Sequence, residues 1–226
     1  EFYRRSSIEF ADIHKTEDTG APMKPQRLMY ELSSRFPLGT RFFADIGNSF
    51  LWAIHYLLPF DRRIAGERKH CSSTFHTSMG FASMGWSIAA AVGAAVARPN
   101  QPVVCIVGDG SMLMSGNEVT VAVQEEVPVI YVILNDGAYG TVKHGQRMTG
   151  AEPIAFELPH VEFHKWAEAI GARGIRVRSA ADWDSIDVEE LCARPGPTVI
   201  DVIIDGEECP PFGTRMKVLQ TAPVAD

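Results

Sequence analysis

The sequence predicts an α/β fold, with a doubly wound, mostly parallel sheet of five or six strands and helices on both faces. Two short and almost wholly apolar runs, residues 102–107 and 127–134, suit parallel strands that are covered on both faces. The segment between them, residues 117–126, has the length of a crossover helix. Strand, Gly-rich turn, helix and strand therefore follow one another in the order that a parallel sheet requires.

The rest of the chain repeats this alternation. Residues 24–36 begin beside two prolines, Pro22 and Pro25, and place four apolar side chains on one face, as an amphipathic helix would. Further helices are predicted over residues 50–58, 83–97, 160–170 and 183–193, and further strands over residues 41–45, 174–178 and 198–204. Residues 137–159 contain two Pro and four Gly, so they are predicted to form one long loop.

Composition favours a cytoplasmic domain without nucleic-acid or membrane partners. The formal net charge of -7 argues against nucleic acid as the main partner. The apolar stretches are interrupted well before the length of a membrane span, and no cleavable signal pattern opens the chain. The four cysteines show no CxxC pairing, which favours reduced thiols: Cys71, Cys105, Cys192 and Cys209.

The most informative motifs follow the two apolar runs. Gly108-Asp109-Gly110-Ser111 follows the first run, and 24 residues (111–134) separate Gly110 from Asn135-Asp136. Each motif then lies at the carboxyl end of its strand, where open α/β sheets bind ligands. Magnesium prefers hard oxygen ligands shared among carboxylates, phosphates and water, and the carboxylates of Asp109 and Asp136 with the carbonyl of Ala138 would supply three. A lone GDG is weak evidence, but the paired strands and the second oxygen cluster strengthen it.

In these motifs the chain resembles the diphosphate-binding domain of thiamine diphosphate enzymes, most closely the acetolactate synthase and pyruvate decarboxylase group, over roughly residues 22–205. The resemblance implies thiamine diphosphate and Mg²⁺ as cofactors, with Gly108, Asp109, Gly110 and Ser111 at the diphosphate. The group carries a second Asn where this chain has Asp136. Asp136 still offers an oxygen to the metal, although it adds a negative charge beside an anionic diphosphate.

Two further segments are similar to cofactor-binding segments of the group. The turn at Ile46-Gly47-Asn48-Ser49 matches a turn that contacts the terminal phosphate, although an ordinary helix N-cap has the same composition. By the same resemblance, Tyr139 and Gly140 join Ala138 as cofactor contacts.

The segment at residues 79–86 is similar to the strip that passes under the cofactor in this group. Met84 matches the bulky side chain that wedges between the two cofactor rings, and the carbonyl of Ala82 matches the acceptor for the exocyclic amino group. A Met among small residues is more often core filling.

The residues after Asp136 should contact the substrate, since they lie over the reactive carbon in this group. Thr141, Val142 and His144 are the candidate catalytic contacts, together with Met84. The chain lacks the Met and Trp that acetolactate synthases carry at positions 141 and 145, and the acidic residue of pyruvate decarboxylases near position 142. Lys143 and Arg147 could meet a substrate carboxylate, although loop cations are usually solvated.

Four other histidines are weaker candidates. Two of them, His160 and His164, stand four residues apart on a predicted helix and could share a metal, but an exposed pair is more common. The other two, His70 and His76, precede the strip and could approach the active site.

The group activates its cofactor with a glutamate from a separate pyrimidine-binding domain, and no segment here resembles that domain. The chain has room for one domain, residues 22–226, after a charged segment, residues 1–21, that is expected to be a linker or the tail of a preceding domain. We therefore expect a C-terminal piece of a longer polypeptide, or one subunit of a split enzyme, that needs the pyrimidine-binding domain for activity.

The resemblance implies a lyase or transferase that decarboxylates 2-oxoacids, joins them to a second carbonyl, or does both. Because the group builds its active site between chains, a homodimer or homotetramer is expected. Two alternatives stay open: an oxidase or oxidoreductase that uses FAD as an additional cofactor, and a non-catalytic cofactor-binding subunit. Neither the GxGxxG pattern of dinucleotide sites nor the GxxxxGK[ST] pattern of nucleotide sites occurs.

Overall fold

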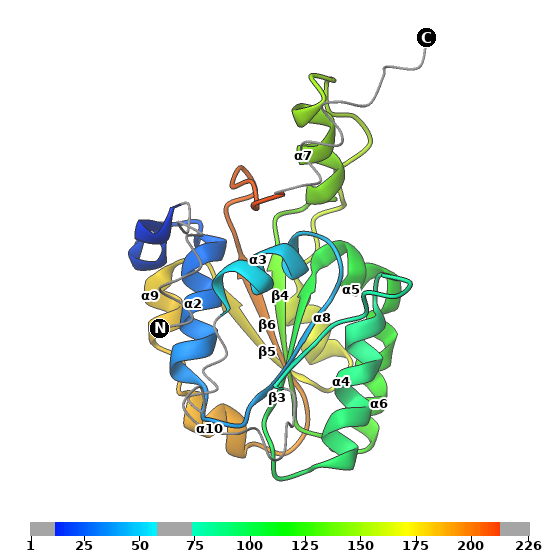
Figure 1. Ribbon diagram of the computed structural model, residues 1–226. Helices are drawn as coiled ribbons and strands as arrows, with labels where there is room; N and C mark the ends of the chain where they lie inside the picture. Colours follow the sequence, from blue (N-terminus) through cyan, green and yellow to red (C-terminus); the bar gives the residue numbers. More distant parts are fainter. Residues whose placement is uncertain (1–11, 58–73, 213–226) are drawn as a thin grey trace, which may run out of the picture.

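The computed structural model describes residues 12–57 and 74–212, and these confirm the predicted doubly wound α/β class (Figure 1). Six parallel strands form one sheet in the order β2-β1-β3-β4-β6-β5 within these ranges. The strands are β1 (Arg41–Ala44), β2 (Phe75–His76), β3 (Val103–Gly108), β4 (Val129–Asn135), β5 (Arg173–Val177) and β6 (Thr198–Ile203).

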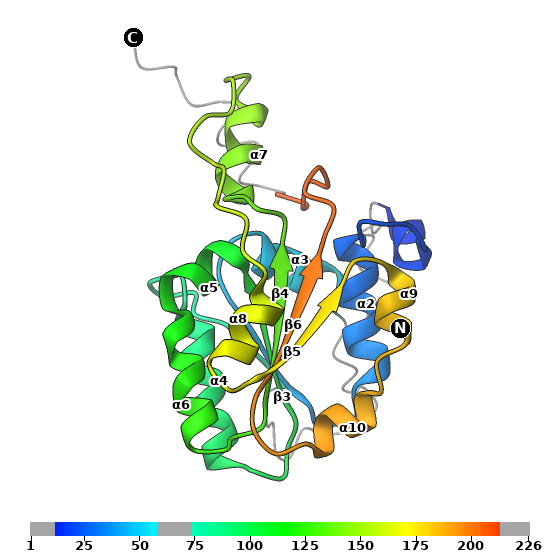
Figure 2. The ribbon, with the colours of Figure 1, turned by 180° about the vertical axis from the view of Figure 1, so that it is seen from behind.

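Helices pack on both faces of this sheet, as Figures 1 and 2 show from opposite sides. One face carries α2 (Pro25–Arg35), α3 (Asn48–Tyr56), α9 (Ala180–Asp184) and α10 (Val188–Ala193). The other carries α4 (Trp86–Ala97), α5 (Asp109–Ser115), α6 (Val119–Gln124) and α8 (Phe163–Ala169). The 3-10 helix η1 (Ile13–Glu17) packs on α2, and η3 (Gly116–Glu118) joins α5 to α6. Helix α7 (Gly140–Met148) projects beyond the carboxyl ends of the strands (Figure 1).

The two hydrophobic cores lie on opposite faces of the central strands. In β4 every residue is buried, and successive side chains alternate between the cores, since Val132 packs into one and Ile133 into the other. This double burial explains why the sequence of β4 reads as one continuous apolar run rather than an alternating pattern.

The sheet has its topological switch point between β1 and β3. The chain leaves β1 through α3, on one face, and leaves β3 through α5 and α6, on the other. The connections therefore diverge between the carboxyl ends of β1 and β3, and a crevice at such a point is where open α/β sheets bind ligands. The turn at residues 46–49 and the GDG motif both lie at this crevice.

The structure corrects four predicted elements. The predicted single loop over residues 137–159 contains helix α7, and the predicted helix over residues 183–193 is two short helices, with Ser179 and Asp187 capping their starts. The GDG motif begins helix α5 rather than forming a free turn, so α5, η3 and α6 together replace the predicted crossover helix. The two-residue strand β2 has no counterpart in the prediction, because its pattern is too short to read.

Candidate functional site

A pocket of about 560 Å³ lies at the carboxyl ends of β1, β3 and β4. Sixteen of the seventeen predicted site residues line it: Ile46, Gly47, Asn48, Ser49, Ala82, Met84, Gly108, Asp109, Gly110, Ser111, Asp136, Ala138, Tyr139, Gly140, Thr141 and Val142. The sequence did not single out six apolar residues that complete the lining: Phe50, Leu51, Met79, Leu134, Ile204 and Phe212.

Asp109 begins α5 at the end of β3, and its carboxylate is held by backbone amides. Its Oδ1 accepts a hydrogen bond from the Gly110 amide and its Oδ2 accepts one from the Gly137 amide, each at 2.7 Å. Burial raises the pKa of Asp109 to about 6, although these amides act in the opposite direction. A Cβ on Gly110 would lie 2.7 Å from the Tyr139 ring, so any side chain here would require that ring to move.

Asp136 follows β4 and faces the same pocket. Burial raises the pKa of Asp136 to about 7, and the neighbouring charge of Asp109 adds to this shift. Two glycines pack tightly around Asp136: a Cβ on Gly206 would lie 2.9 Å from its Cβ, and one on Gly140 would lie 3.3 Å from its Oδ2. A buried carboxylate, Asp109, and a partly buried one, Asp136, that repel each other are an arrangement that a divalent cation would relieve.

The turn before α3 lines the pocket with residues 46–49. Gly47 has φ 100° and ψ -152°, a conformation that is essentially restricted to glycine. The Asn48 Oδ1 accepts a hydrogen bond from the Thr141 hydroxyl at 3.0 Å, which links this turn to α7. The Ser49 hydroxyl donates to the carbonyl of Asp45 at 2.9 Å, so the turn offers its amides, rather than this hydroxyl, to a ligand.

The strip at residues 79–86 borders the pocket as predicted. Met84 is half-buried and lines the pocket, and it belongs to neither hydrophobic core of the described residues. Ala82 has φ 58°, a left-handed conformation that is strained for a residue with a Cβ.

Asp45 organises this region, and the sequence analysis did not identify it. It is 1% exposed at the end of β1, and its carboxylate accepts hydrogen bonds from the amides of Gly85 and Ser87 and from the hydroxyls of Ser87 and Ser111. Asp45 therefore ties the strip and the start of α5 to β1. The Ser111 hydroxyl is directed to Asp45, at 3.0 Å.

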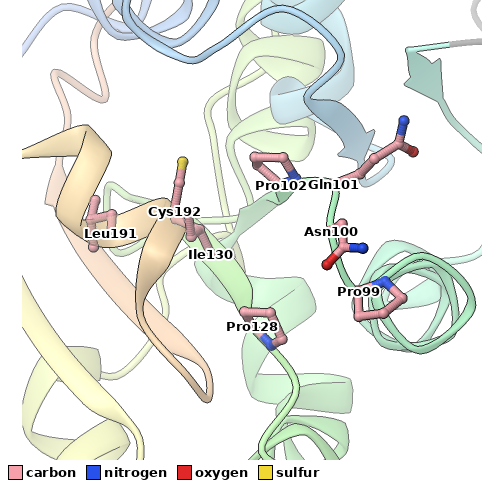
Figure 3. Close-up of a pocket in the computed structure, with 8 residues that line it drawn as sticks. All are labelled: Pro99, Asn100, Gln101, Pro102, Pro128, Ile130, Leu191 and Cys192. Atoms are coloured by element: carbon pink, nitrogen blue, oxygen red, sulfur yellow. The ribbon is translucent and has the colours of Figure 1, made fainter.

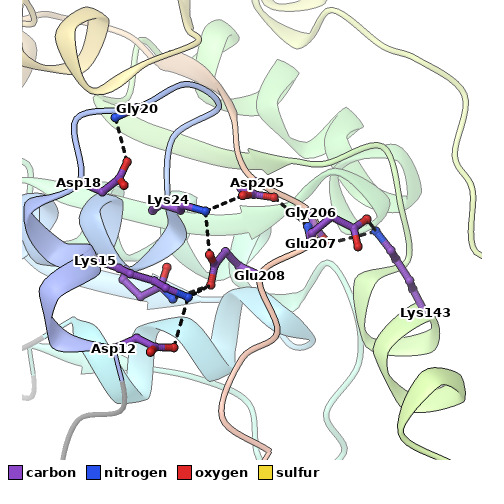
Figure 4. A network of polar contacts seen from close by, with 11 residues as sticks. Asp12, Lys15, Asp18, Gly20, Lys24, Lys143, Asp205, Gly206, Glu207 and Glu208 are labelled. Carbon is purple, nitrogen blue, oxygen red and sulfur yellow. Dashed lines mark hydrogen bonds and ion pairs between the residues drawn. The ribbon is translucent and has the colours of Figure 1, made fainter. Parts of the chain in front are cut away.

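Helix α7 brings Gly140, Thr141 and Val142 to the pocket. Lys143 and Arg147 both bind Glu207, with Nζ–Oε1 and Nη1–Oε2 distances of 2.6 Å, so in this structure both are paired, Lys143 buried and Arg147 exposed. Figure 4 shows Lys143 reaching the segment at residues 205–208.

His144 is 3% exposed and is not among the pocket-lining residues of the described chain. Its pKa is lowered by burial and by the charges of Lys143 and Arg147. Its backbone partner is Glu208, and its Nε2 is buried without a hydrogen bond to any described residue.

The other candidate histidines lie away from the pocket lining. His76 stacks on Phe43 with ring centroids 4.6 Å apart, and His160 is exposed before the start of α8. His164 is not on an exposed face, because its Nδ1 lies 3.1 Å from the buried carboxylate of Asp201. His70 falls outside the described residues.

A second, smaller cavity of about 250 Å³ lies at the opposite end of the sheet (Figure 3). It is lined by prolines at the amino ends of β3 and β4 and by Cys192, and it shares no residue with the candidate site.

The candidate site fits a diphosphate held through a divalent cation. In the described part of the chain no cluster of three or more His, Cys, Asp or Glu side chains could hold a metal alone. A cation here would therefore need phosphate and backbone oxygens beside the carboxylates of Asp109 and Asp136, as magnesium sites for phosphate ligands commonly do. Within residues 12–57 and 74–212, none of the helices has the length and hydrophobicity that a membrane span requires.

Comparisons with known proteins agree with this geometry. The chain is 30% identical over 200 residues to the acetolactate synthase isozyme 2 large subunit of Escherichia coli, covering 85% of this chain and 34% of that protein. It is 27% identical over 214 residues to the acetolactate synthase of Bacillus subtilis, covering 91% and 36%. The solved structure of benzoylformate decarboxylase from Polynucleobacter necessarius is similar with a TM-score of 0.71 and 25% identity, covering 84% and 34%. The chain thus spans about a third of the length of these relatives.

A family model described as thiamine pyrophosphate enzyme, C-terminal TPP binding domain, matches residues 45–202, and thiamine pyrophosphate is another name for thiamine diphosphate. This match runs from Asp45, at the end of β1, into β6, and so includes both strand-end motifs. The predicted resemblance is confirmed, and the chain belongs to the family of C-terminal, cofactor-binding domains of thiamine pyrophosphate enzymes.

Proposed function

We propose that this domain binds the diphosphate end of thiamine diphosphate through Mg²⁺, as part of an enzyme that decarboxylates or joins 2-oxoacids. One observation carries the proposal: Asp109 and Asp136 follow neighbouring parallel strands and face one pocket at the switch point of the sheet. Acetolactate synthases and a benzoylformate decarboxylase among the relatives support the substrate class.

The cation would be held by the carboxylates of Asp109 and Asp136 and by the carbonyl of Ala138. Backbone amides at two helix starts would face the phosphates, because the first N–H groups of a helix lack partners inside it. These amides belong to residues 47–49, before and within α3, and to Ser111 in α5, whereas the Gly110 amide already donates to the Asp109 carboxylate.

Other pocket residues would orient the rest of the cofactor. Met84 would support its rings, and the carbonyl of Ala82 would accept a hydrogen bond from it. Ile46, Gly108, Tyr139 and Gly140 would complete its surroundings. When bound, thiamine diphosphate supplies the electron sink for breaking a bond beside the 2-oxo group.

We propose that residues at the start of α7 determine which substrate is bound. Thr141 and Val142 line the pocket and would contact the substrate directly. His144 lies behind them, so we propose that it acts through the position of α7.

A partner is expected at the rim of the pocket. Five exposed apolar side chains come from two segments that meet where Gly85 lies against Ser115: Met79, Phe81, Trp86, Leu113 and Met114. Phe81 is 90% exposed, and apolar surface of this kind marks interfaces. We propose that a pyrimidine-binding domain or subunit covers this rim, within a homodimer or homotetramer.

We also propose that the enzyme works in the cytoplasm. The three cysteines within the described ranges, Cys105, Cys192 and Cys209, are free, as a reducing compartment would leave them. FAD would be an additional cofactor only if the enzyme is an oxidase, and its visible absorbance in the purified complete protein would reveal it.

Calorimetry on the complete protein tests the proposal. Thiamine diphosphate should bind tightly with Mg²⁺ and weakly after chelation, whereas NAD and ATP should show no comparable binding. Consumption of pyruvate and of benzoylformate with Mg²⁺ and thiamine diphosphate then tests the substrate class. Binding of thiamine diphosphate that is indifferent to the metal would refute the proposed site.

A further inference from the structure

We propose that His164, Asp201 and Asn135 form a positioning network that fixes the carboxyl end of β4, and with it Asp136, for the divalent cation. The inference rests on the proposed function, because it concerns the same cation. None of the three residues lines the pocket within the described ranges, so they would act through Asp136 rather than on the ligand.

Asp201 is the centre of the network. It lies in β6, is 0% exposed, and accepts a hydrogen bond at Oδ1 from the Asn135 Nδ2 at 2.8 Å. Its Oδ2 lies 3.1 Å from the His164 Nδ1. A carboxylate oxygen that accepts a hydrogen bond here would require the His164 tautomer with its hydrogen on Nδ1. An unpaired buried carboxylate would be strongly unfavourable, which makes both partners necessary.

Asn135 carries the effect of this centre to the cofactor motif. It is the last residue of β4 and directly precedes Asp136. Its Nδ2 donates both to Asp201 and to the carbonyl of Val161, at 3.1 Å, and these two acceptors fix the orientation of the amide. Its own carbonyl accepts from the Ile204 amide at 3.2 Å, so backbone and side chain are both anchored to β6 or its continuation.

His164 is itself held firmly. Its side chain is 15% exposed, and its backbone carbonyl packs so closely against β5 that a Cβ on Gly174 would lie 2.0 Å from the carbonyl oxygen. Helix α8 is therefore in direct contact with β5 at this residue, and the imidazole reaches from a fixed backbone to Asp201.

The sheet geometry explains why these side chains meet. Asp201 pairs with Ile133, and both point to the face covered by α8, whereas Val202 points to the other core. Asn135 lies two residues beyond Ile133 and so projects from the same face. If packing were the only requirement, an apolar residue would fill position 201 equally well. Val199, two residues earlier on the same face, is such an apolar residue.

Substitutions that break the network should change the apparent affinity of the protein for Mg²⁺. Hydrogen-bond partners behind a metal ligand typically alter metal affinity 10–100-fold when removed. We expect Asp201→Val and His164→Ala to weaken the apparent Mg²⁺ affinity, in calorimetric titrations with thiamine diphosphate, by about 10–100-fold. Asp201→Asn can keep both hydrogen bonds if His164 changes tautomer, and His164→Asn can place a donor where Nδ1 lies, so both should retain most of the affinity.

The experiment uses the complete protein, with melting by circular dichroism as a check on folding. His160→Ala is the matched control, since His160 is exposed and lies four residues away. Unchanged Mg²⁺ affinity in folded Asp201→Val and His164→Ala variants would overturn the inference. Losses of Mg²⁺ affinity in Asp201→Asn and His164→Asn as large as those in Asp201→Val and His164→Ala would also overturn it. If Asp201→Val does not fold, the two His164 variants decide. An unaltered protein that takes up no cofactor would instead overturn the proposed function.

Discussion

The Oδ2 of Asp109 accepts a hydrogen bond from the amide of Gly137 at 2.7 Å, which joins the residues that follow β3 and β4. The Gly110 amide binds the other oxygen at the same distance. The carboxylate is thus oriented by backbone groups on both sides, a form of preorganisation that fixes its position independently of a ligand.

Asp109→Asn should remove most of the Mg²⁺ dependence of thiamine diphosphate binding, with a loss beyond the roughly 100-fold expected of indirect partners. Burial raises the pKa of Asp109 to about 6, so the ionised side chain is unfavourable in the metal-free protein at higher pH. Asparagine has an acceptor for only one of the two amides, so the variant loses a hydrogen bond, but its melting temperature should fall less between pH 4 and pH 8 than that of the unaltered protein. Calorimetry and thermal melting test both points. Asp184→Asn, at an exposed position, is the control. Unchanged Mg²⁺ dependence of thiamine diphosphate binding in Asp109→Asn would exclude Asp109 as a ligand.

Gly140→Ala should disrupt the junction between the second motif and α3. The added Cβ would lie 2.3 Å from the Asn48 Nδ2, so the Asn48 side chain, which belongs to the proposed phosphate-binding turn and accepts a hydrogen bond from Thr141, has to move. We expect a loss of about 1–3 kcal/mol in the free energy of unfolding and weaker cofactor binding. Gly145→Ala is the matched control in the same helix, since nothing lies within 4 Å of its added Cβ.

This control should stabilise the protein by up to about 1 kcal/mol, because alanine favours a helix more than glycine does. Urea unfolding and calorimetry compare the two variants. Equal stability of both would show that the contact between Gly140 and Asn48 is easily relaxed.

Ala82→Val should destabilise the strip under the proposed cofactor. Ala82 has φ 58°, a region that β-branched residues rarely adopt, and we expect a loss of about 1–3 kcal/mol. Ala82→Gly removes the strain and should keep both stability and cofactor affinity close to those of the unaltered protein. Thermal melting with and without cofactor measures both effects; a valine variant as stable as the glycine variant would contradict the strained conformation.

The sequence could predict the sheet and both motifs because their signals are local. A buried parallel strand such as β4 needs a continuous apolar run, and its ligand-bearing residue directly follows that run. The helical nature of α7 was not predictable in this way. Gly140 and Gly145 lower its intrinsic helix propensity, while its anchor, Glu207, lies 64 residues from Lys143 in the chain.

Asp45 was missed for a similar reason. As an acid at a strand end it resembles many solvent-exposed residues in sequence. Its role depends on partners 40 to 66 residues away, at Gly85, Ser87 and Ser111. The same holds for Asp201, which reads as a polar interruption in a strand until its contacts with Asn135 and His164 are known.

The acidic segment at residues 205–208, which follows β6, should make the free energy of unfolding depend on pH in the acid range. Glu208 binds Lys15 and Lys24, each at 2.7 Å, and joins the N-terminal segment to the end of the sheet (Figure 4). Burial raises the pKa of Glu208, but hydrogen bonds from Lys15, Lys24 and Gln26 outweigh it and lower the pKa from 4.5 to about 2. A carboxyl group with a depressed pKa stabilises the folded state above its unfolded pKa, and this contribution is lost as the pH falls through about 2.

Glu208→Gln should therefore lower the free energy of unfolding by about 1–2 kcal/mol at pH 7 and by progressively less between pH 4.5 and 2. Glu207→Gln is the comparison, because hydrogen bonds from Lys143 and Arg147 lower the pKa of Glu207 to about 2 as well, yet its side chain is 66% exposed. Solvent screening should limit its effect to less than about 1 kcal/mol. Urea unfolding of the three proteins from pH 2 to 7 measures this difference. A Glu208→Gln variant whose loss of stability is the same at pH 2 and pH 7 would show that packing, and not the ionised carboxylate, accounts for its contribution.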